Sequence, residues 1–201
     1  MADEYLQNAA KPQGEFGAQV LAKMNEHHKE LADWAFSQVT VAPDADTLDI
    51  GCGGGANLAR LLATCPQGTA TGVDYAATSV ESSRALNAAA VDAGRCRVEQ
   101  GDVAALPFPD ASFDFAVACE TVYFWPDLDA ALAEVRRVLR PGATFLTICE
   151  MSDPDDPRAA DAADLMTVYR PSDLRQRYRE AGFAPVSLYC QGPWYCLVAR
   201  V

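Results

Sequence analysis

Short apolar runs alternate with amphipathic stretches along most of this chain of 201 residues. Runs rich in β-branched residues predict strands, and side chains that recur at three- and four-residue steps predict helices. The expected strands span residues 47–51, 69–74, 95–100, 114–119, 143–149, 185–190 and 194–200. The expected helices span residues 16–38, 56–64, 78–91, 127–139, 159–168 and 172–181. Strands that alternate with helices form a parallel sheet, and the turn Gln191-Gly192-Pro193 adds an antiparallel hairpin at its edge.

The first 42 residues are expected to form an N-terminal helical cap, and residues 43–201 the core, within one domain overall. Residues 1–14 carry little pattern and are expected to be loose. The helix expected over residues 16–38 has one stripe of side chains that would pack against the core. This stripe consists of Val20, Met24, His27, Leu31 and Trp34.

Two interpretations of this helix remain open. In one, it is a static helix packed on the edge of the sheet. In the other, it is a lid with hinges at Gly14 and Gly17, and it carries four side chains into a functional site. These side chains are Phe16, Met24, Asn25 and His28. A histidine placed there can orient a substrate or take its proton near neutral pH, so His28 is a candidate catalytic residue.

The sequence Gly51-Cys52-Gly53-Gly54-Gly55 separates the first expected strand from the first helix of the core. The order strand, glycine turn and helix allows a nucleotide-like ligand to lie against bare backbone at a helix N-terminus. A Cβ atom would block either the tight turn or the approach of the ligand. Asp74 lies at the tip of the next strand, where its carboxylate can bind both hydroxyls of a ribose. Dinucleotides and S-adenosylmethionine (SAM) both carry that ribose, so these residues alone fit either ligand.

Composition narrows the classes of function. The formal net charge is −12, whereas nucleic-acid binders usually carry a basic face, so we expect no nucleic-acid partner. No segment is apolar enough to span a membrane, and the N-terminus resembles no targeting signal, so we expect a cytoplasmic protein without a membrane partner. The seven cysteines form no CxxC pair, and four of them lie in or beside apolar, strand-like runs, as expected in a reducing compartment. His27 and His28 have no cysteine or histidine partner at ligand spacing, so we expect no metal site.

Three further segments resemble those of one family. Gly101-Asp102-Val103 with the following turn, residues 134–142 and residues 169–183 occur in the order and at the distances found in class I SAM-dependent methyltransferases. Within that family the chain is similar to the UbiE/Coq5-like small-molecule enzymes. The resemblance implies a three-layer Rossmann-like α/β fold. Its seven-stranded sheet would have the order 3-2-1-4-5-7-6, with strand seven antiparallel to otherwise parallel strands.

The resemblance also implies how SAM binds. Asp49, Gly51, Gly53 and Gly55 would surround the methionine half and the ribose. Asp74 would bind the ribose diol, Tyr75 would lie along the adenine, and Asp102 with the backbone of Val103 would receive the adenine edge. Cys119 and Glu120 would face the methionine amino group and the sulfonium. Ser79, in the helix after Asp74, completes the expected cofactor-binding residues.

The methyl acceptor would lie beyond Glu120. Tyr123 and Trp125, in the aromatic run after strand four, are the expected walls of its pocket, while Glu150 and Tyr169 are further candidates. A general base is optional in methyl transfer, because the donor is already activated. The candidate catalytic residues are His28, Glu120 and Tyr123.

The expected function is therefore transfer of a methyl group from SAM to an O, N or C atom of a small molecule, by a monomer or homodimer. Two alternatives remain open: an NAD(P)-dependent oxidoreductase, which the missing Tyr-x-x-x-Lys pair disfavours, and a SAM-binding protein without catalysis.

Overall fold

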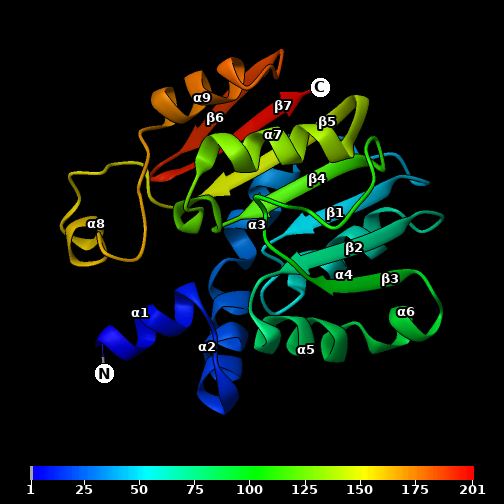
Figure 1. The fold of residues 1–201 in the computed structure, drawn as a ribbon, viewed down its shortest axis with the longest axis horizontal. Helices are drawn as coiled ribbons and strands as arrows, with labels where there is room; N and C mark the ends of the chain where they lie inside the picture. The colour runs from blue at the N-terminus through cyan, green and yellow to red at the C-terminus, as the bar shows by residue number, and fades with distance from the viewer. Residues whose placement is uncertain (1) are drawn as a thin grey trace.

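A seven-stranded sheet forms the middle layer of the structure, a computed structural model that describes residues 2–201 (Figure 1). The strands are β1 (Asp46–Ile50), β2 (Thr69–Asp74), β3 (Cys96–Gln100), β4 (Phe113–Cys119), β5 (Leu139–Cys149), β6 (Val186–Gln191) and β7 (Trp194–Arg200). Their order is β3-β2-β1-β4-β5-β7-β6. Neighbouring strands are parallel, except that β7 runs antiparallel to both β5 and β6. The predicted fold class and strand order are confirmed.

Helices cover both faces of the sheet. They are α1 (Ala2–Ala10), α2 (Gly14–His27), α3 (Lys29–Phe36), α4 (Ala56–Thr64), α5 (Ala77–Leu86), α6 (Ala88–Asp92), α7 (Leu128–Val138), α8 (Pro157–Asp161) and α9 (Pro171–Glu180), with a 3-10 turn η1 (Val122–Phe124). On one face, α3, α4 and α5 bury Leu31, Leu58 and Val80 in one apolar core. On the other, α7 and α9 bury Leu132 and Tyr178 in a second core. Each such side chain stabilises the fold by about 1.5–3 kcal/mol, so the two cores hold the sheet rigidly from both sides.

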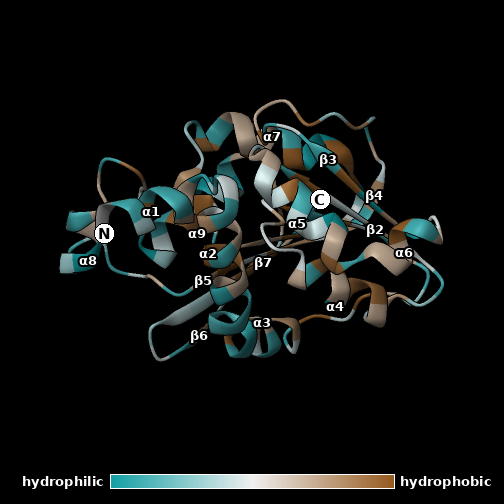
Figure 2. Cartoon of the chain, turned by 90° about the horizontal axis from the view of Figure 1, so that it is seen from below, coloured by the Kyte–Doolittle hydropathy of each residue, from teal (hydrophilic) through white to brown (hydrophobic). Residues whose placement is uncertain are grey.

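Hydrophobic colour gathers on the strands and on α4 beside them, whereas α8 is hydrophilic and lies apart from the sheet (Figures 1 and 2). No helix within residues 2–201 is long and apolar enough to cross a membrane.

The carboxyl ends of β1 and β4 point toward the side of the molecule where α1 and α2 lie (Figure 1). Parallel pairing of β1 with β2 and β4 brings the segments that follow these strands to one edge. In sheets of this kind, ligands bind in the crevice outside the carboxyl ends of the strands.

The N-terminal segment differs from the sequence prediction. Residues expected to be loose form α1, and the single helix expected over residues 16–38 is divided at His28 into α2 and α3. The packing of α1 against α2 depends on Gly17, because a Cβ at this position would lie 2.8 Å from the backbone carbonyl carbon of Pro12. Gly17 therefore allows close packing with the segment that follows α1. A helix as short as α1 depends on such tertiary contacts, which local sequence does not show.

Three other boundaries also differ. The helix expected over residues 78–91 ends at Leu86, and the Asn87 side chain donates hydrogen bonds to the carbonyl oxygens of Ser83 and Gly55. β5 begins at Leu139, four residues early, because Leu139 pairs with Phe113 across an irregular register. The helix expected over residues 159–168 is the shorter α8, capped by the Asp156 carboxylate.

Candidate functional site

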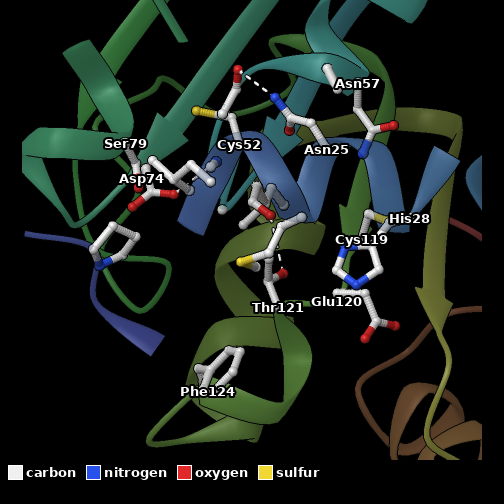
Figure 3. Close-up of a pocket in the computed structure, with 18 of the residues that line it drawn as sticks. Asn25, His28, Cys52, Asn57, Asp74, Ser79, Cys119, Glu120, Thr121 and Phe124 are labelled. Carbon is white, nitrogen blue, oxygen red and sulfur yellow. Dashed lines mark hydrogen bonds between the residues drawn. The ribbon is translucent and has the colours of Figure 1, made fainter. Parts of the chain in front are cut away.

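A cavity of about 680 Å³ lies at the carboxyl ends of β1–β4, within the size range of small-molecule sites. The glycine loop, the tips of β2 and β4, the segment after β3, α4 and the N-terminal helices all contribute to its walls. Asp74 and Ser79 lie together on one side of the cavity, His28, Cys119 and Glu120 lie on another, and Phe124 lies apart from both groups (Figure 3).

The glycine loop has a backbone that other residues adopt with strain. Gly51, Gly53 and Gly55 have φ angles of +71°, +50° and +82°. A Cβ on Gly51 would lie 2.4 Å from the Thr121 methyl carbon, so the loop packs directly against the segment after β4. The Thr121 hydroxyl fixes that contact by donating to the Ile50 carbonyl at 3.1 Å. The loop thus presents bare backbone to the cavity, as a nucleotide-like ligand requires.

Asp74 is a rigidly held carboxylate at the cavity wall. Its two oxygens accept hydrogen bonds from the backbone amides of Gly53 at 3.0 Å and Ala76 at 2.9 Å. Burial raises the pKa of Asp74, and these two amides oppose the rise. The buried Ser79 hydroxyl, also in the cavity wall, lies beside the Asp74 carboxylate and helps to oppose the rise of its pKa, but it makes no hydrogen bond of ideal geometry within the described residues. Ser79 lies inside α5 and does not cap it, since the cap position is Ala76. A buried hydroxyl with free hydrogen-bonding capacity beside a fixed acid fits a ligand that brings hydroxyl groups of its own.

Asp49 and Gly55 lie outside the cavity lining and support the loop from behind. Asp49 is 1% exposed, and its Oδ2 atom has no hydrogen-bond partner within residues 2–201. Burial, and then the charge of Asp74, raise the pKa of Asp49 to about 7. Gly55 gives the Asn87 and Ser83 side chains room to approach, because a Cβ there would lie 2.7 Å from the Asn87 amide nitrogen.

The segment after β3 brings Asp102 and Val103 into the cavity wall. Asp102 is exposed, and one of its oxygens accepts the Ala104 amide at 2.9 Å. Tyr75 also lines the cavity, although its side chain is half-exposed and turned toward the N-terminal segment. Its hydroxyl donates to the Ala10 carbonyl, and the Lys11 ammonium lies 5.5 Å from the centre of its ring. Tyr75 thus ties the core to the segment between α1 and α2.

At the tip of β4, Glu120 has a strained backbone, with φ at +58°, and is 8% exposed. Its Oε1 atom accepts the Glu150 backbone amide at 2.5 Å and the Tyr123 hydroxyl at 3.4 Å. Burial, and then the negative charge of Glu150, raise the pKa of Glu120 well above its ordinary value. Both causes favour the protonated form of the Glu120 carboxyl group. Strain of this kind is concentrated at functional sites.

The α2–α3 region closes the cavity from above the glycine loop. Leu21, Met24, Asn25 and His28 all line the cavity, and the Asn25 side-chain amide donates to the Gly54 carbonyl at 3.2 Å. Burial lowers the pKa of His28, while the charge of Glu150 opposes the shift, so the imidazole is neutral at pH 7. Phe16 is 40% exposed and lies outside the lining.

The other residues predicted to bind the methyl acceptor also fall into two groups, those that line the cavity and those that do not. Trp125 lines the cavity together with Phe124 and Pro126. Tyr123 is buried beneath them, where its hydroxyl accepts the Met151 amide at 2.9 Å. Tyr169 and Glu150 lie outside the lining, and the Glu150 carboxylate instead meets His27 at 3.1 Å.

Several lining residues were missed from the sequence. Thr121 directly follows Glu120, and Cys52 lies inside the glycine run. Their positions beside predicted site residues could have identified both as cavity-lining residues. Asn57 and Arg60 lie in the first turns of α4, where the same reasoning applies. Ala9, Ala10 and Pro12 had no such signal, because α1 itself was not expected.

Comparison with known proteins agrees with this geometry. Residues 48–147 match the family model of a methyltransferase domain. The chain is 34% identical to the O-methyltransferase cnsE of Penicillium expansum over 70% of this chain and 52% of that protein. It is 30% identical to the 27-O-demethylrifamycin SV methyltransferase of Amycolatopsis mediterranei, over 86% of this chain and 68% of that protein. The chain thus spans about half the length of the fungal relative.

A solved structure shares the fold. The SAM-dependent methyltransferase of Aquifex aeolicus superposes with a TM-score of 0.74 at 17% identity, covering 90% of this chain and 97% of that one. Because the family model covers residues 48–147, the Amycolatopsis relative matches over 86% of the chain, and the strand order is that of the family, this chain belongs to the class I, Rossmann-like SAM-dependent methyltransferases.

Proposed function

We propose that the chain transfers a methyl group from SAM to a small-molecule acceptor within the 680 Å³ cavity. One observation carries this proposal. A bare glycine loop, a carboxylate fixed by two backbone amides and a buried hydroxyl beside that carboxylate face one enclosed space. This combination fits a ligand with a ribose and a charged, flexible end.

Asp74 is suited to bind the ribose diol, because its orientation is set by Gly53 and Ala76 before any ligand arrives. Each of its oxygens retains a lone pair for a ligand hydroxyl. Asp102 and the Val103 backbone would bind the adenine edge, and the Ser79 hydroxyl lies near enough to the same end to contribute. Cys119, Glu120 and Thr121 would surround the methionine end, where Gly51 permits close approach.

The acceptor would lie between His28, Phe124 and Trp125. SAM supplies a methyl group that is already activated, so the protein mainly aligns the acceptor and excludes water. Leu21 and Met24 cover this space from α2 and exclude water from it.

Among the candidate catalytic residues, His28 is suited to accept a proton, because burial keeps its imidazole neutral at pH 7. Burial favours the protonated form of Glu120, so its carboxyl group is better suited to donate a hydrogen bond to the ligand than to accept a proton. Tyr123 has no contact with the cavity and would act by orienting Glu120.

The names of the two relatives favour an oxygen atom as the methyl acceptor, with nitrogen and carbon as alternatives. Placement among the UbiE/Coq5-like enzymes, a cytoplasmic location and a monomeric or homodimeric state belong to the same proposal. So does the lack of a nucleic-acid partner. The acidic net charge of −12 supports the lack of a nucleic-acid partner, and the seven free cysteines support a reducing compartment such as the cytoplasm.

Two measurements test the proposed function. Calorimetric titration with SAM, S-adenosylhomocysteine and NADH should give binding of the first two and none of NADH. Transfer of tritium from methyl-labelled SAM into a metabolite extract should then give a labelled product. Binding of NADH in place of SAM would favour the oxidoreductase, and binding of SAM without transfer to any extract would favour a non-catalytic SAM-binding protein.

A further inference from the structure

His27, His28 and Glu150 meet at the rim of the cavity. Each offers one ligand atom, and these three atoms lie within 4.8 Å of one another. The Nε2 atom of His27 is 3.1 Å from a carboxylate oxygen of Glu150, and the two imidazole centres are 5.0 Å apart. Within residues 2–201, this is the one group of three such side chains close enough to share a metal ion.

The positions of the three residues in the fold make the cluster more than a chance contact. His27 ends α2, His28 forms the junction with α3, and Glu150 directly follows β5. The Glu150 amide is itself fixed by Glu120 at 2.5 Å. The side chain of His27 is 67% exposed and that of Glu150 is 28% exposed, whereas His28 faces the cavity. The cluster thus joins the N-terminal cap to the core, with one side open to solvent and one to the cavity.

We propose that His27, His28 and Glu150 bind a divalent transition-metal ion, with Zn²⁺ as the best fit. Two imidazoles and one carboxylate form the ligand set of several zinc sites that keep an open coordination position. Imidazole nitrogen favours zinc and its transition-metal neighbours over Mg²⁺ and Ca²⁺, which prefer oxygen ligands.

The required movement is small. In a tetrahedral site, two ligand atoms that are each about 2.1 Å from the zinc ion lie about 3.4 Å apart. The present limit of 4.8 Å is larger, so an ion would draw the three side chains inward. The exposed His27 side chain is free to make that adjustment, since its one described hydrogen bond is to Glu150. The expectation of no metal site failed to foresee the cluster because 123 positions separate His27 from Glu150.

The open positions of the ion would take an oxygen atom of the methyl acceptor, such as a hydroxyl or carboxylate. This second step rests on the proposed function. His28 brings the ion to the cavity wall, where it would hold the ion instead of accepting a proton, and a bound hydroxyl would ionise more easily because a zinc ion lowers its pKa.

The metal site is tested without SAM or any acceptor. Co²⁺ is titrated into the full chain carrying Cys190→Ser, which removes an exposed thiol, and the visible absorption of the bound ion is followed. We expect saturable binding of one ion, competition by Zn²⁺ and no near-ultraviolet band of a cobalt–thiolate bond. Glu150→Gln and His28→Ala should each weaken binding by at least about 100-fold, because each removes a ligand. Glu30→Gln is the matched control, since it removes an exposed carboxylate of the same neighbourhood and should leave Co²⁺ affinity unchanged.

A Co²⁺ affinity that stays the same in Glu150→Gln, a thiolate band, or no binding at millimolar Co²⁺ would each overturn the site. If Co²⁺ binds as expected and SAM does not, the proposed function fails while the metal site stands. The open positions are tested by adding acetohydroxamate, a small chelating oxygen ligand, to the Co²⁺ form. A changed absorption spectrum supports acceptor coordination, and an unchanged one refutes it.

Discussion

The two halves of the cavity are built differently. On the side of β1–β3, the groups that face the cavity are fixed by the core. Asp74 is held by two backbone amides, and Gly51 lies against Thr121 with no room for a side chain. On the opposite side, the N-terminal cap places apolar side chains such as Val20, Leu21 and Leu31 in buried positions and also makes polar contacts with the core. These polar contacts include Asn25 to Gly54, Tyr75 to Ala10, His27 to Glu150, and Asp33 to Arg60.

This difference separates two tasks. The first side is preorganised, which raises affinity for a constant ligand because little has to be ordered on binding. The second side can open only if these hydrogen bonds, each worth about 0.5–1.5 kcal/mol, are broken and the buried side chains of Val20 and Leu21 become exposed. An enzyme with one donor and a separate acceptor needs both properties, since the donor site is the same in every cycle while the acceptor must enter and the product leave.

The largest effect is expected for Gly53→Val. Its backbone, with φ at +50°, resists a β-branched residue, and the Cβ would lie 3.4 Å from Leu21 and against the space for the ligand. SAM affinity should fall by more than about 100-fold, equal to about 2.8 kcal/mol, as measured by calorimetry.

Gly142→Val is the matched control, because Gly142 has φ at +83° with nothing within 4 Å of its added Cβ. It places the same strain far from the cavity and should lower stability while leaving SAM affinity intact. A folded Gly53→Val protein with wild-type affinity would show that the glycine loop does not contact SAM.

A smaller loss is expected for Asp74→Ala. Removal of a charge-assisted contact to two hydroxyls should weaken SAM binding about 10- to 100-fold, or about 1.5–3 kcal/mol. Asp74→Glu should recover little, because the longer side chain cannot keep both backbone amides of Gly53 and Ala76. Asp102→Ala should cost less than Asp74→Ala, since Asp102 is exposed and held by one amide. A larger loss of affinity for Asp102→Ala than for Asp74→Ala would contradict the assignment of Asp74 to the preorganised side of the cavity.

The same division explains how much of the molecule could be read from its sequence. The strand order, the glycine loop and Asp74 were predicted, because each depends on local pattern and on topology shared by the family. Gly55 and Asp49, which were also predicted to surround the ligand, lie outside the cavity lining, so their direct contact with SAM stays a prediction. A motif shows which residues act together, whereas their order from the cavity inward depends on packing.

The cap side was harder to predict for a physical reason. The contact between Gly17 and Pro12 and the bond from Tyr75 to Ala10 are tertiary, so α1 leaves no strong local signal. Among the aromatic run, Trp125 reaches the cavity and Tyr123 does not, because the η1 turn rotates neighbouring side chains apart. The sequence indicated the right segment but not which side chain faces inward.

A moderate effect is expected for the cap contacts. Asn25→Ala removes the hydrogen bond to the Gly54 carbonyl and should weaken binding of S-adenosylhomocysteine about fivefold, or about 1 kcal/mol. His28→Ala should reduce turnover more than stability, because its imidazole faces the cavity.

Amide exchange distinguishes a lid from a static helix. Exchange of residues 12–30 should slow markedly when S-adenosylhomocysteine is added, and Asn25→Ala should reduce that slowing. If the exchange rates of this segment do not change when S-adenosylhomocysteine is added, and His28→Ala has normal turnover, the cap is a static helix packed on the core.

The smallest effect concerns the proton on Asp49. Its pKa rises from 3.8 to about 7 in the folded chain, so between these values the folded protein holds a proton that the unfolded chain has lost. The free energy of unfolding contributed by Asp49 is therefore fully present below pH 3.8 and declines as the pH rises toward 7.

A cationic ligand in the cavity favours the ionised carboxylate of Asp49 and lowers its pKa. At pH 6.5, binding of SAM should release a fraction of a proton, detected by calorimetry in two buffers of different ionisation enthalpy. Asp49→Asn should abolish most of the release and flatten the decline of stability. Proton uptake on binding of SAM, or equal proton release in Asp49→Asn, would show that the ionisation of Asp49 does not respond to SAM.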